Sequence, residues 1–395
     1  MKGKQAGKIL VIPSWYPPKG GYFFREHALA LANEGLEVDV MAGLHTSLRT
    51  LRLKELQNVR KIEIHTLDGI TEYLKKYWII PFSNRPNFHG WISLMLRFFR
   101  KYQERQGPPD LILAHSSIWA GLVAAFIKEK YGIPYVITEH RSRFVYNTPE
   151  ARQQFEPWFF PYLKIAFEGA AAVVTVSKSL QPFIREVAPE VEGRLHCIPN
   201  MVDTDFFHPA KGKKPLKPFR FFSLANLIPL KGMDTLVEAF ASASQEFEGD
   251  CQLVIGGDGP ERPRLERLLE EKRLRGKVVY AGKLNRSQVL DQMQQAHAFL
   301  LASHFEAFGV VFIEAMATGL PLIATRSGGP ESIVNENIGL LVESGKSDQL
   351  AGALLEMMNQ YERYQPAHIR QEAITRYSKS AVAQQYIKLF DNIKK

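Results

Sequence analysis

The chain has 395 residues, of which 45% are hydrophobic and 23% are charged. This composition excludes a collagen-like, low-complexity or disordered chain, and the length predicts about two to three domains. The 50 lysines and arginines exceed the 41 aspartates and glutamates by nine. Such an excess favours a polyanionic partner: nucleic acid, a phosphorylated ligand or an anionic membrane surface.

The number of cysteines and the sequence of the first residues indicate in which cellular compartment the protein is located. Two cysteines, Cys197 and Cys251, are too few for a disulfide framework or a four-cysteine zinc site. The apolar run 9–12 is too short for a signal peptide, and no run has the roughly 18 apolar residues of a membrane span. We therefore expect a cytoplasmic protein, with peripheral attachment to the inner face of the cell membrane left open.

Short apolar runs alternate with longer segments of helical period along the whole chain. The first group of runs predicts strands at 8–12, 36–41, 110–115, 134–139 and 171–176. The second group predicts strands at 219–225, 251–256, 277–281, 297–302, 320–325 and 338–342. Helices are predicted at 23–33, 119–130, 233–244, 261–272 and 347–359. Continuous apolar runs suit strands buried on both faces, so the alternation predicts parallel sheets covered by helices.

A proline- and lysine-rich segment divides this pattern. Residues 209–218 have the composition of a linker, which separates an N-terminal domain, 1–208, from a C-terminal domain, 219–377. Each domain is large enough for its own doubly wound sheet. The last segment, 378–395, has the pattern of an amphipathic helix that could pack back on the N-terminal domain.

Ligands in such sheets bind beyond the carboxyl ends of the strands, so the segments that follow each strand are the candidate ligand sites. Gly20 and Gly21 follow the first strand, where they either let backbone amides approach a ligand or form a plain tight turn. Lys231 precedes a predicted helix, where it either pairs with a phosphate or is a solvated loop residue.

The strongest single pattern is at residues 303–321. Glu306 lies in a loop, and Glu314 lies inside a helix predicted from Val310 to Gly319. Carboxylates accept hydrogen bonds from sugar hydroxyls, and the amides at a helix start hold an anion. The alternative is an ordinary amphipathic helix with two solvated acids.

The stretch E-A-F-G-V-V-F-I-E-A-M-A-T-G-L-P-L-I-A-T, followed by S-G-G-P-E, resembles the signature of family-4 retaining glycosyltransferases of GT-B fold. It includes their pair of glutamates, Glu306 and Glu314. Further matches are S-W-Y-P-P-K-G-G-Y-F-F-R-E-H-A near the start, V-S-K-S, I-P-N-M-V-D-T-D-F-F-H-P, P-L-K-G and G-D-G-P. The fold that the resemblance implies is α/β, with two Rossmann-like doubly wound domains facing a cleft.

The resemblance also implies the roles of individual residues. It assigns donor binding to Gly20, Gly21, Asn226, Lys231, Lys283, Leu284, Glu306, Phe308, Gly309, Val310, Val311 and Glu314. It assigns catalysis to His140, Glu306 and Lys231, with His140 beside the reacting sugar at a strand end; His115, at another strand end, ranks below it. Glu314 would hold the ribose hydroxyls of the nucleotide.

One residue departs from the family pattern. The family has arginine five residues before the diphosphate lysine, and this chain has Asn226 there. Asparagine offers two N–H donors and no charge, so the diphosphate is held less tightly unless another cation, such as Arg326, compensates.

The implied reaction is transfer of a sugar from a UDP-, GDP- or ADP-sugar to a hydroxyl acceptor with retention of configuration. We expect no cofactor and no metal, because the one Asp-x-Asp sequence, at 203–205, does not follow a predicted strand. A non-catalytic nucleotide-sugar binder and a GT-B epimerase are the alternatives. Nucleic acid is a minor alternative, since the charge is spread over both halves and no recognition motif is present.

The acceptor is the least defined partner: a carbohydrate, a lipid-linked compound or a small molecule. Residues 75–105 hold seven lysines or arginines, one acid and eight aromatic residues. This segment is either a basic helix at an anionic membrane surface or a helix whose aromatic side chains pack into the core.

Overall fold

The computed structural model describes residues 7–18, 20–46, 61–80, 84–141, 156–212, 214–215 and 217–393. The chain forms two compact units. The N-terminal unit comprises Met1–Val176, Leu180–Ile198 and Val382–Lys395, and the C-terminal unit comprises Ser177–Ser179 and Pro199–Ala381. Residues 209–218, in their described part, form no helix or strand.

The N-terminal unit is built on one sheet with the strand order β3-β4-β2-β1-β5-β6-β7-β8. Its strands are β1 (Lys8–Pro13), β2 (Glu37–Thr46), β3 (Ile62–Leu67), β4 (Ile70–Trp78), β5 (Leu111–His115), β6 (Tyr135–Glu139), β7 (Ala172–Thr175) and β8 (Leu195–Cys197). All neighbours are parallel except β3 and β4, which form an antiparallel edge. In the register of the central strands, Leu10 pairs with Asp39 on one side and Ile112 on the other.

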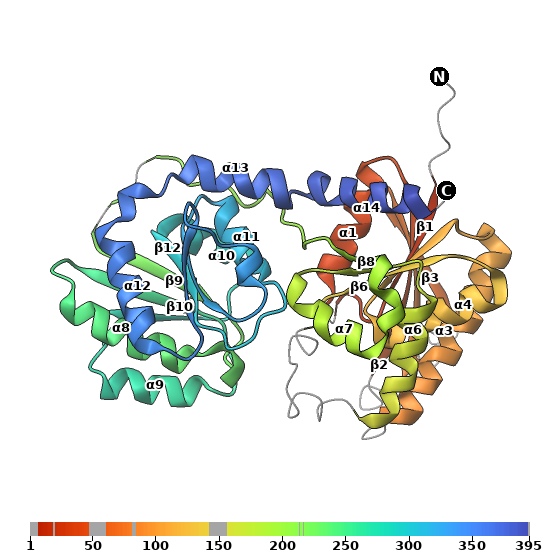
Figure 1. The fold of residues 1–395 in the computed structure, drawn as a ribbon, viewed down its shortest axis with the longest axis horizontal. Helices are drawn as coiled ribbons and strands as arrows, with labels where there is room; N and C mark the ends of the chain where they lie inside the picture. The colour runs from red at the N-terminus through yellow and green to blue at the C-terminus, as the bar shows by residue number, and fades with distance from the viewer. Residues whose placement is uncertain are drawn as a thin grey trace. The chain divides into compact units, whose positions relative to one another are not determined.

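Helices cover this sheet (Figure 1). They are α1 (Tyr22–Asn33), α3 (Asn84–Gln106), α4 (Leu122–Tyr131), α6 (Phe160–Gly169), α7 (Gln181–Val187) and the C-terminal α14 (Lys379–Ile393). The helix predicted from residue 119 begins only at Leu122, because Ser116 and Trp119 have positive φ angles that a helix cannot contain. Tyr386 of α14 lies 3.0 Å from Thr138 of β6, oxygen to oxygen, so the end of the chain packs on this sheet.

Helix α3 contains most of the aromatic residues of segment 75–105, and its packing shows whether they face the core or the solvent. Its aromatic side chains are buried in the core of the N-terminal unit: Phe88, Trp91, Phe98, Phe99 and Tyr102. Its exposed side carries cations instead: Arg85, Arg97, Arg100, Lys101 and Arg105. Residues 81–83 of the segment lie outside the described residues. Among the described helices, none combines the length and the apolar character needed to cross a membrane.

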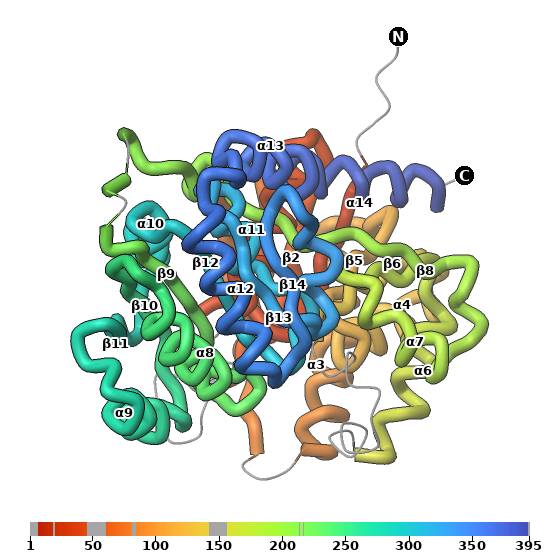
Figure 2. Tube along the Cα trace, turned by 60° about the vertical axis from the view of Figure 1, so that its left-hand side comes forward, coloured from red at the N-terminus to blue at the C-terminus, as the bar shows by residue number. Residues whose placement is uncertain are grey.

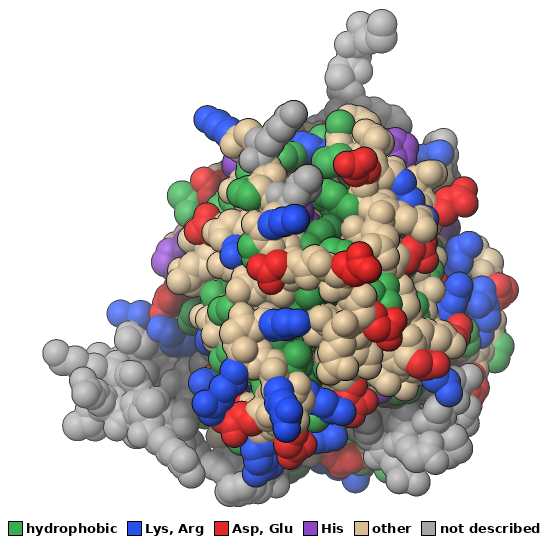
Figure 3. Space-filling view, turned by 90° about the vertical axis from the view of Figure 1, so that its left-hand side faces the viewer, with side chains coloured by type: hydrophobic (Ala, Val, Ile, Leu, Met, Phe, Trp, Pro, Cys, Tyr) green, Lys and Arg blue, Asp and Glu red, His purple; other side chains and the backbone are tan. Residues whose placement is uncertain are grey.

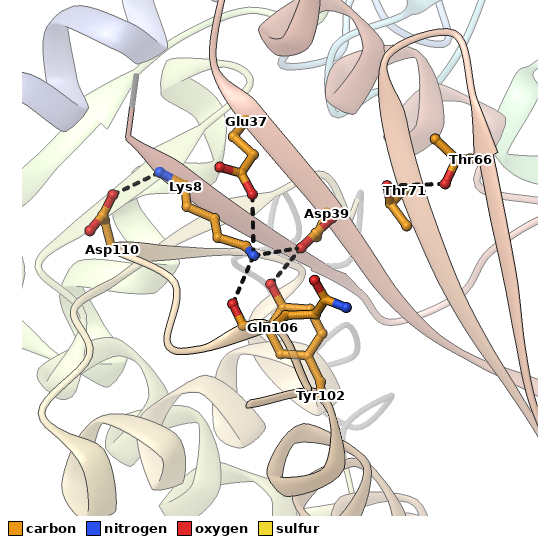
Figure 4. A network of polar contacts seen from close by, with 8 residues as sticks. All are labelled: Lys8, Glu37, Asp39, Thr66, Thr71, Tyr102, Gln106 and Asp110. Atoms are coloured by element: carbon orange, nitrogen blue, oxygen red, sulfur yellow. Dashed lines mark hydrogen bonds and ion pairs between the residues drawn. The ribbon is translucent and has the colours of Figure 1, made fainter. Parts of the chain in front are cut away.

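A polar network ties the end of α3 to the start of the sheet (Figure 4). The Nζ atom of Lys8 lies 3.2 Å from Glu37 and 3.4 Å from Asp39, and it donates to the carbonyl of Gln106. Tyr102 donates to Asp39 at 2.7 Å, and burial together with this carboxylate raises the pKa of the phenol. Lys8 therefore has a structural role at the start of the sheet.

The C-terminal unit has a parallel sheet with the order β11-β10-β9-β12-β13-β14. Its strands are β9 (Phe219–Leu224), β10 (Cys251–Gly256), β11 (Val278–Gly282), β12 (Ala298–Leu301), β13 (Leu322–Arg326) and β14 (Gly339–Glu343). Its helices are α8 (Met233–Glu246), α9 (Arg262–Glu271), α10 (Arg286–Gln295), α11 (Val310–Ala317), α12 (Ser347–Asn359) and α13 (Pro366–Tyr377), and Figure 2 follows them along the chain. In the middle of the sheet Phe222 pairs with Val254 and with Phe299.

The surface charge in Figure 3 is mixed, with Lys and Arg side chains interspersed among Asp and Glu. Two of the cations of α9 are paired: Arg262 lies 2.8 Å from Glu266, and Arg264 lies 3.0 Å from Glu261. Among the described residues on the face in Figure 3, no continuous basic stripe of the kind that binds a nucleic-acid backbone is visible.

Candidate active site

A cavity of 670 Å³ lies in the C-terminal unit, at the carboxyl ends of its central strands. It is lined by Leu224, Ala225, Asn226, Lys231, Gly257, Asp258, Gly259, Lys283, Leu284, Leu301, Glu306, Gly309, Val310 and Val311. The sheet order reverses between β9 and β12, and crevices at such switch points are where open α/β sheets bind ligands.

One wall of the cavity is made by loops whose backbones touch. Gly257 has a φ of +118°, and a Cβ atom there would lie 1.8 Å from the carbonyl oxygen of Ala225. A second contact joins the same two loops, because the amide of Leu227 donates to the carbonyl of Asp258 at 3.0 Å. A side chain at position 257 would force these loops apart and open the wall.

An ion pair lies within the cavity. Lys231 ends a short turn before α8, and its Nζ atom lies 2.5 Å from Oε2 of Glu306. The two side chains are only 20% and 15% exposed. The backbone of Glu306 is fixed as well, since it donates to Ser327 at 2.9 Å and accepts from Gly329 at 2.8 Å. The pair therefore offers a cation and an acceptor in a fixed geometry.

The third element is the start of α11. Gly309, with a φ of +89°, precedes the helix, and no side chain caps its first turn. The amides of Val310 and Val311 at the cavity wall are among those that an α-helix leaves without an internal partner. The helix dipole adds partial positive charge at the same point, which favours an anionic group.

The cavity gathers most of the residues that the sequence assigned to donor binding: Asn226, Lys231, Lys283, Leu284, Glu306, Gly309, Val310 and Val311. Phe308 is buried behind it, with its ring 5.9 Å from that of Tyr377. Glu314 lies in the second turn of α11 and does not line it. Arg326 does not line it either and pairs with Glu343 at 3.2 Å, so its compensation for the missing arginine stays a prediction.

Other lining residues were not assigned from the sequence: Leu224, Ala225, Gly257, Asp258, Gly259 and Leu301. The G-D-G-P match contained three of them but gave them no role. Asp258 matters most, because it adds a second carboxylate to a cavity that has two lysines.

Gly20, Gly21 and His140 belong to the N-terminal unit. Gly21 has a φ of +75° and directly precedes α1, and a Cβ atom there would lie 2.7 Å from the carbonyl oxygen of Trp15. His140 follows β6 directly, and its Nε2 atom lies 3.1 Å from Nδ1 of His115.

Two further histidines, His115 and His27, are buried next to His140. The ring of His115 packs against that of His27, with the centroids 5.2 Å apart. Burial lowers the pKa of His27 to about 3 and lowers that of His115 well below 6.5, and the neighbouring histidines act in the same direction. Both rings are therefore neutral at pH 7. His115, which the sequence analysis ranked below His140 as a catalytic candidate, therefore packs against His140.

Two family models match the chain in tandem. The model described as Glycosyltransferase Family 4 matches residues 20–206, and the model described as Glycosyl transferases group 1 matches residues 205–376. The chain belongs to the group 1 glycosyltransferases. The cavity of this glycosyltransferase lies inside the second matched segment.

A curated relative of this glycosyltransferase is the 2-deoxystreptamine N-acetyl-D-glucosaminyltransferase of Niallia circulans. It is 26% identical over 383 residues, which cover 92% of the chain and 94% of the relative. Among solved structures, sucrose-phosphate synthase from Thermosynechococcus elongatus has a TM-score of 0.78 at 21% identity, covering 98% of this chain and 99% of that one. HepE from Anabaena, in complex with UDP, has a TM-score of 0.72 at 18% identity, covering 98% and 100%. The fold is GT-B.

Proposed function

We propose that the chain transfers a sugar from a nucleotide-diphosphate sugar to a hydroxyl acceptor, with retention of configuration and without a metal. The observation that carries the proposal is the cavity of the C-terminal unit. In it Lys231, Glu306 and the first amides of α11 offer a cation, an acceptor and backbone donors together. That combination suits a sugar next to a diphosphate. HepE, a structural neighbour, has been solved with UDP-glucose.

The chemistry follows from where charge develops. The acceptor oxygen bonds to the anomeric carbon as the bond from that carbon to the diphosphate breaks, and the acceptor proton passes to the leaving phosphate oxygen. The diphosphate gains negative charge, which the Lys231 ammonium and the amides of Val310 and Val311 stabilise. Glu306 accepts hydrogen bonds from the sugar hydroxyls. Retention comes from the family resemblance.

Four further residues complete the proposal. Glu314 holds the ribose hydroxyls, Gly20 and Gly21 bring backbone amides to the diphosphate, and His140 contacts the reacting sugar. None of these lines the cavity of the C-terminal unit. Their roles therefore depend on the resemblance more than those of Lys231 and Glu306 do.

A melting-temperature screen with UDP-, GDP- and ADP-sugars tests donor binding, because a ligand that binds the native state raises the melting temperature. We expect one nucleotide class to stabilise the protein and Glu314→Ala to reduce that shift. The exposed Glu336→Ala is the matched control and should leave the shift unchanged. If no nucleotide sugar shifts the melting temperature, the proposal fails. NMR of the product linkage tests retention, and an inverted anomer contradicts it.

The alternative of a non-catalytic binder rests on Asn226, which lines the cavity where the family has arginine. A binder would show the melting shift but neither hydrolysis nor transfer of the donor sugar. An epimerase would release the sugar with one inverted centre, which the same NMR spectra detect.

We also propose a cytoplasmic location with attachment to an anionic membrane through the exposed cations of α3. This contact is electrostatic, because the aromatic residues of α3 are buried. Each cation near the surface contributes about 1 kcal/mol. Wild type should sediment with phosphatidylserine vesicles but not with phosphatidylcholine vesicles, and the triple variant R97E/R100E/K101E should stay in solution. Equal sedimentation of the two proteins would refute the contact.

A further inference from the structure

His140 lines a cavity of 930 Å³ in the N-terminal unit. The cavity lies at the carboxyl ends of β1, β5 and β6, and four aromatic rings line it as well: Trp15, Phe23, Trp119 and Phe159. The sheet order reverses between β1 and β5, as it does beside the cavity of the C-terminal unit. His140 is half-buried in this wall, so the groups that hold its ring decide which atom it can present.

The parallel register of β5 and β6 brings two histidines together. His115, the last residue of β5, pairs with Thr138 of β6, and His140 lies two residues further along the chain. The Nδ1 atom of His115 lies 3.1 Å from the Nε2 atom of His140. The ring of Phe24 packs on both, with its centroid 4.5 Å from that of His115 and 5.4 Å from that of His140. The side chain of His140 is therefore held on its Nε2 side.

A buried carboxylate holds the main chain of the same residue. Glu139 has no solvent exposure and accepts hydrogen bonds from the amides of His140 and Arg141, at 2.9 and 3.0 Å. It also accepts from the amide and the hydroxyl of Ser117, at 2.9 and 2.7 Å, in the turn that follows His115. One carboxylate thus joins the segment after β5 to the segment after β6.

The hydrogen bond between the two histidines can run in two directions. His115 is neutral at pH 7, because burial and the neighbouring histidines lower its pKa well below 6.5. A neutral imidazole has one N–H and one lone pair. If Nδ1 of His115 donates, both rings carry their proton on Nδ1. If Nε2 of His140 donates instead, His115 must carry its proton on Nε2.

The second nitrogen of His115 decides between these directions. Its Nε2 atom is buried and has no hydrogen-bond partner within the part of the chain that the structure describes. A proton on this atom would be a buried donor without an acceptor, whereas a lone pair there leaves only an acceptor unused. Among backbone groups the orphaned N–H is the rarer of the two, and the same desolvation argument applies to an imidazole. The direction from His115 to His140 is therefore favoured.

We infer that His115 and Glu139 are positioning residues for His140: Glu139 fixes its main chain, and His115 fixes its ring with the proton on Nδ1. His140 then acts on the substrate as a hydrogen-bond donor and not as a base. This agrees with a reaction in which the acceptor proton passes to the leaving phosphate oxygen. The role in the reaction rests on the proposed transferase function, whereas the arrangement of the two histidines does not.

Long-range proton–nitrogen NMR spectra of the full chain at about pH 8, where an ordinary imidazole is neutral, test the arrangement. A ring nitrogen that carries a proton differs strongly in chemical shift from one with a lone pair. The chain has 11 histidines, and spectra of His115→Asn and His140→Asn assign the two rings. We expect both to carry the proton on Nδ1. A proton on Nε2 of either ring, or averaging between the two nitrogens, overturns the inference.

Hydrolysis of the donor tests the positioning role of His115, with UDP-glucose, GDP-mannose and ADP-glucose as probes and water as the acceptor. His115→Leu removes the hydrogen bond to His140, so kcat should fall about tenfold. The KM for the donor should stay within about threefold, because the nucleotide is bound in the C-terminal unit. His115→Asn keeps an amide donor close to the position of Nδ1 and should restore most of the rate.

His27→Phe is the matched control for packing. His27 is buried as well, and its ring lies 5.2 Å from that of His115, centroid to centroid. We expect the rate of this variant to stay within about threefold of wild type. Equal losses in His115→Leu, His115→Asn and His27→Phe would make His115 a merely structural residue. If wild type hydrolyses none of the probes, the transferase proposal fails, and the NMR spectra still decide the arrangement of the histidines.

Glu139→Gln tests the other positioning residue. The amide keeps one acceptor oxygen and turns the other into a donor that faces donors, so the main chain of His140 should shift. At a temperature where circular dichroism shows wild-type folding, we expect kcat to fall about tenfold and the nucleotide melting shift to stay unchanged. A lower melting temperature with an unchanged kcat would make Glu139 a merely structural residue.

Discussion

The two cavities occupy equivalent places in their sheets but are built from different materials. In the C-terminal unit the wall combines glycine loops, the start of α11 and the ion pair of Lys231 with Glu306. In the N-terminal unit the wall is largely side chain, with four aromatic rings above a turn that Glu139 holds. A backbone wall recognises phosphate and a ring of hydroxyls in a general way, whereas an aromatic wall is specific to the shape of its ligand.

This difference suggests how the two units divide their roles. The donor-side cavity depends on charges and on loops that tolerate few substitutions, because a Cβ atom at Gly257 would collide with Ala225. The cavity of the N-terminal unit could change its ligand by exchanging one ring for another without disturbing the sheet. We expect variants of the two cavities to act independently.

The largest effect is expected from Lys231→Ala. It removes the cation that stabilises the leaving diphosphate and leaves Glu306 without its partner. Transfer should slow by about 100- to 1,000-fold, as for the loss of one strong donor in other transition states. The rate is measured by release of nucleoside diphosphate at saturating donor.

Lys272→Ala, at an exposed position outside the cavity, should leave the rate unchanged. The nitrogen chemical shifts of His115 and His140 should also be unchanged in Lys231→Ala. A rate within about threefold of wild type would remove Lys231 from the mechanism, and altered shifts would show that the two cavities are coupled.

An intermediate effect is expected when the pH is lowered, because the buried histidines of the N-terminal unit then reduce the free energy of unfolding. The pKa of His27 is about 3 in the folded chain because of burial, whereas its ordinary value is 6.5. Below pH 6.5 the unfolded chain takes up a proton that the folded chain refuses. The free energy of unfolding should therefore fall by about 1.4 kcal/mol per pH unit from this residue, and the loss continues towards pH 3.

Denaturant unfolding at pH 7 and pH 5.5 measures this loss, followed by tryptophan fluorescence. All five tryptophans lie in the N-terminal unit, so the signal reports on it alone. His115, His140 and Tyr386 face the ring of His27, and the pKa of His115 is lowered too, so His27→Phe should remove only part of the slope. A variant that keeps the full slope would refute the role of His27.

The smallest effect is expected from Asn226→Arg. The cavity has two lysines and two carboxylates, and a third cation beside the diphosphate should tighten nucleotide binding by about 1 kcal/mol, or roughly fivefold. Isothermal titration with the best nucleotide of the melting screen measures the change. Asn226→Gln adds length without charge and is the control. If the arginine variant binds no better, the departure at position 226 does not limit donor binding.

Most of the fold could be predicted from the sequence, because the strands that build both sheets are continuous apolar runs. The hairpin of β3 and β4 was missed, since its exposed edge alternates polar and apolar residues and has no such run. The sequence predicts the start of α4 at Trp119 because local composition is helical there. In the structure Ser116 and Trp119 have positive φ angles, and Ser116 and Ser117 bond to the carboxylate of Glu139, more than 20 residues away.

The two cavities also differ in how much of each could be predicted from the sequence. The donor residues lie in short contiguous motifs, because a loop after a strand presents its own backbone, and such a motif can be recognised within one stretch of sequence. Even so, only the structure separated Glu306, which lines the cavity, from Glu314, which does not. It also showed that Arg326, the candidate for the missing charge, pairs with Glu343 outside the cavity.

The sequence by itself determined the α/β class, the family and the ends of the strands at which ligands would bind. Only the tertiary structure decided that Trp119, Phe23 and Phe159 share a cavity, that the aromatic residues of α3 are core, and that His115 and Glu139 contact His140. The physical reason is burial. Local preferences are encoded in neighbouring residues, whereas the partner of a buried carboxylate or aromatic ring comes from another strand.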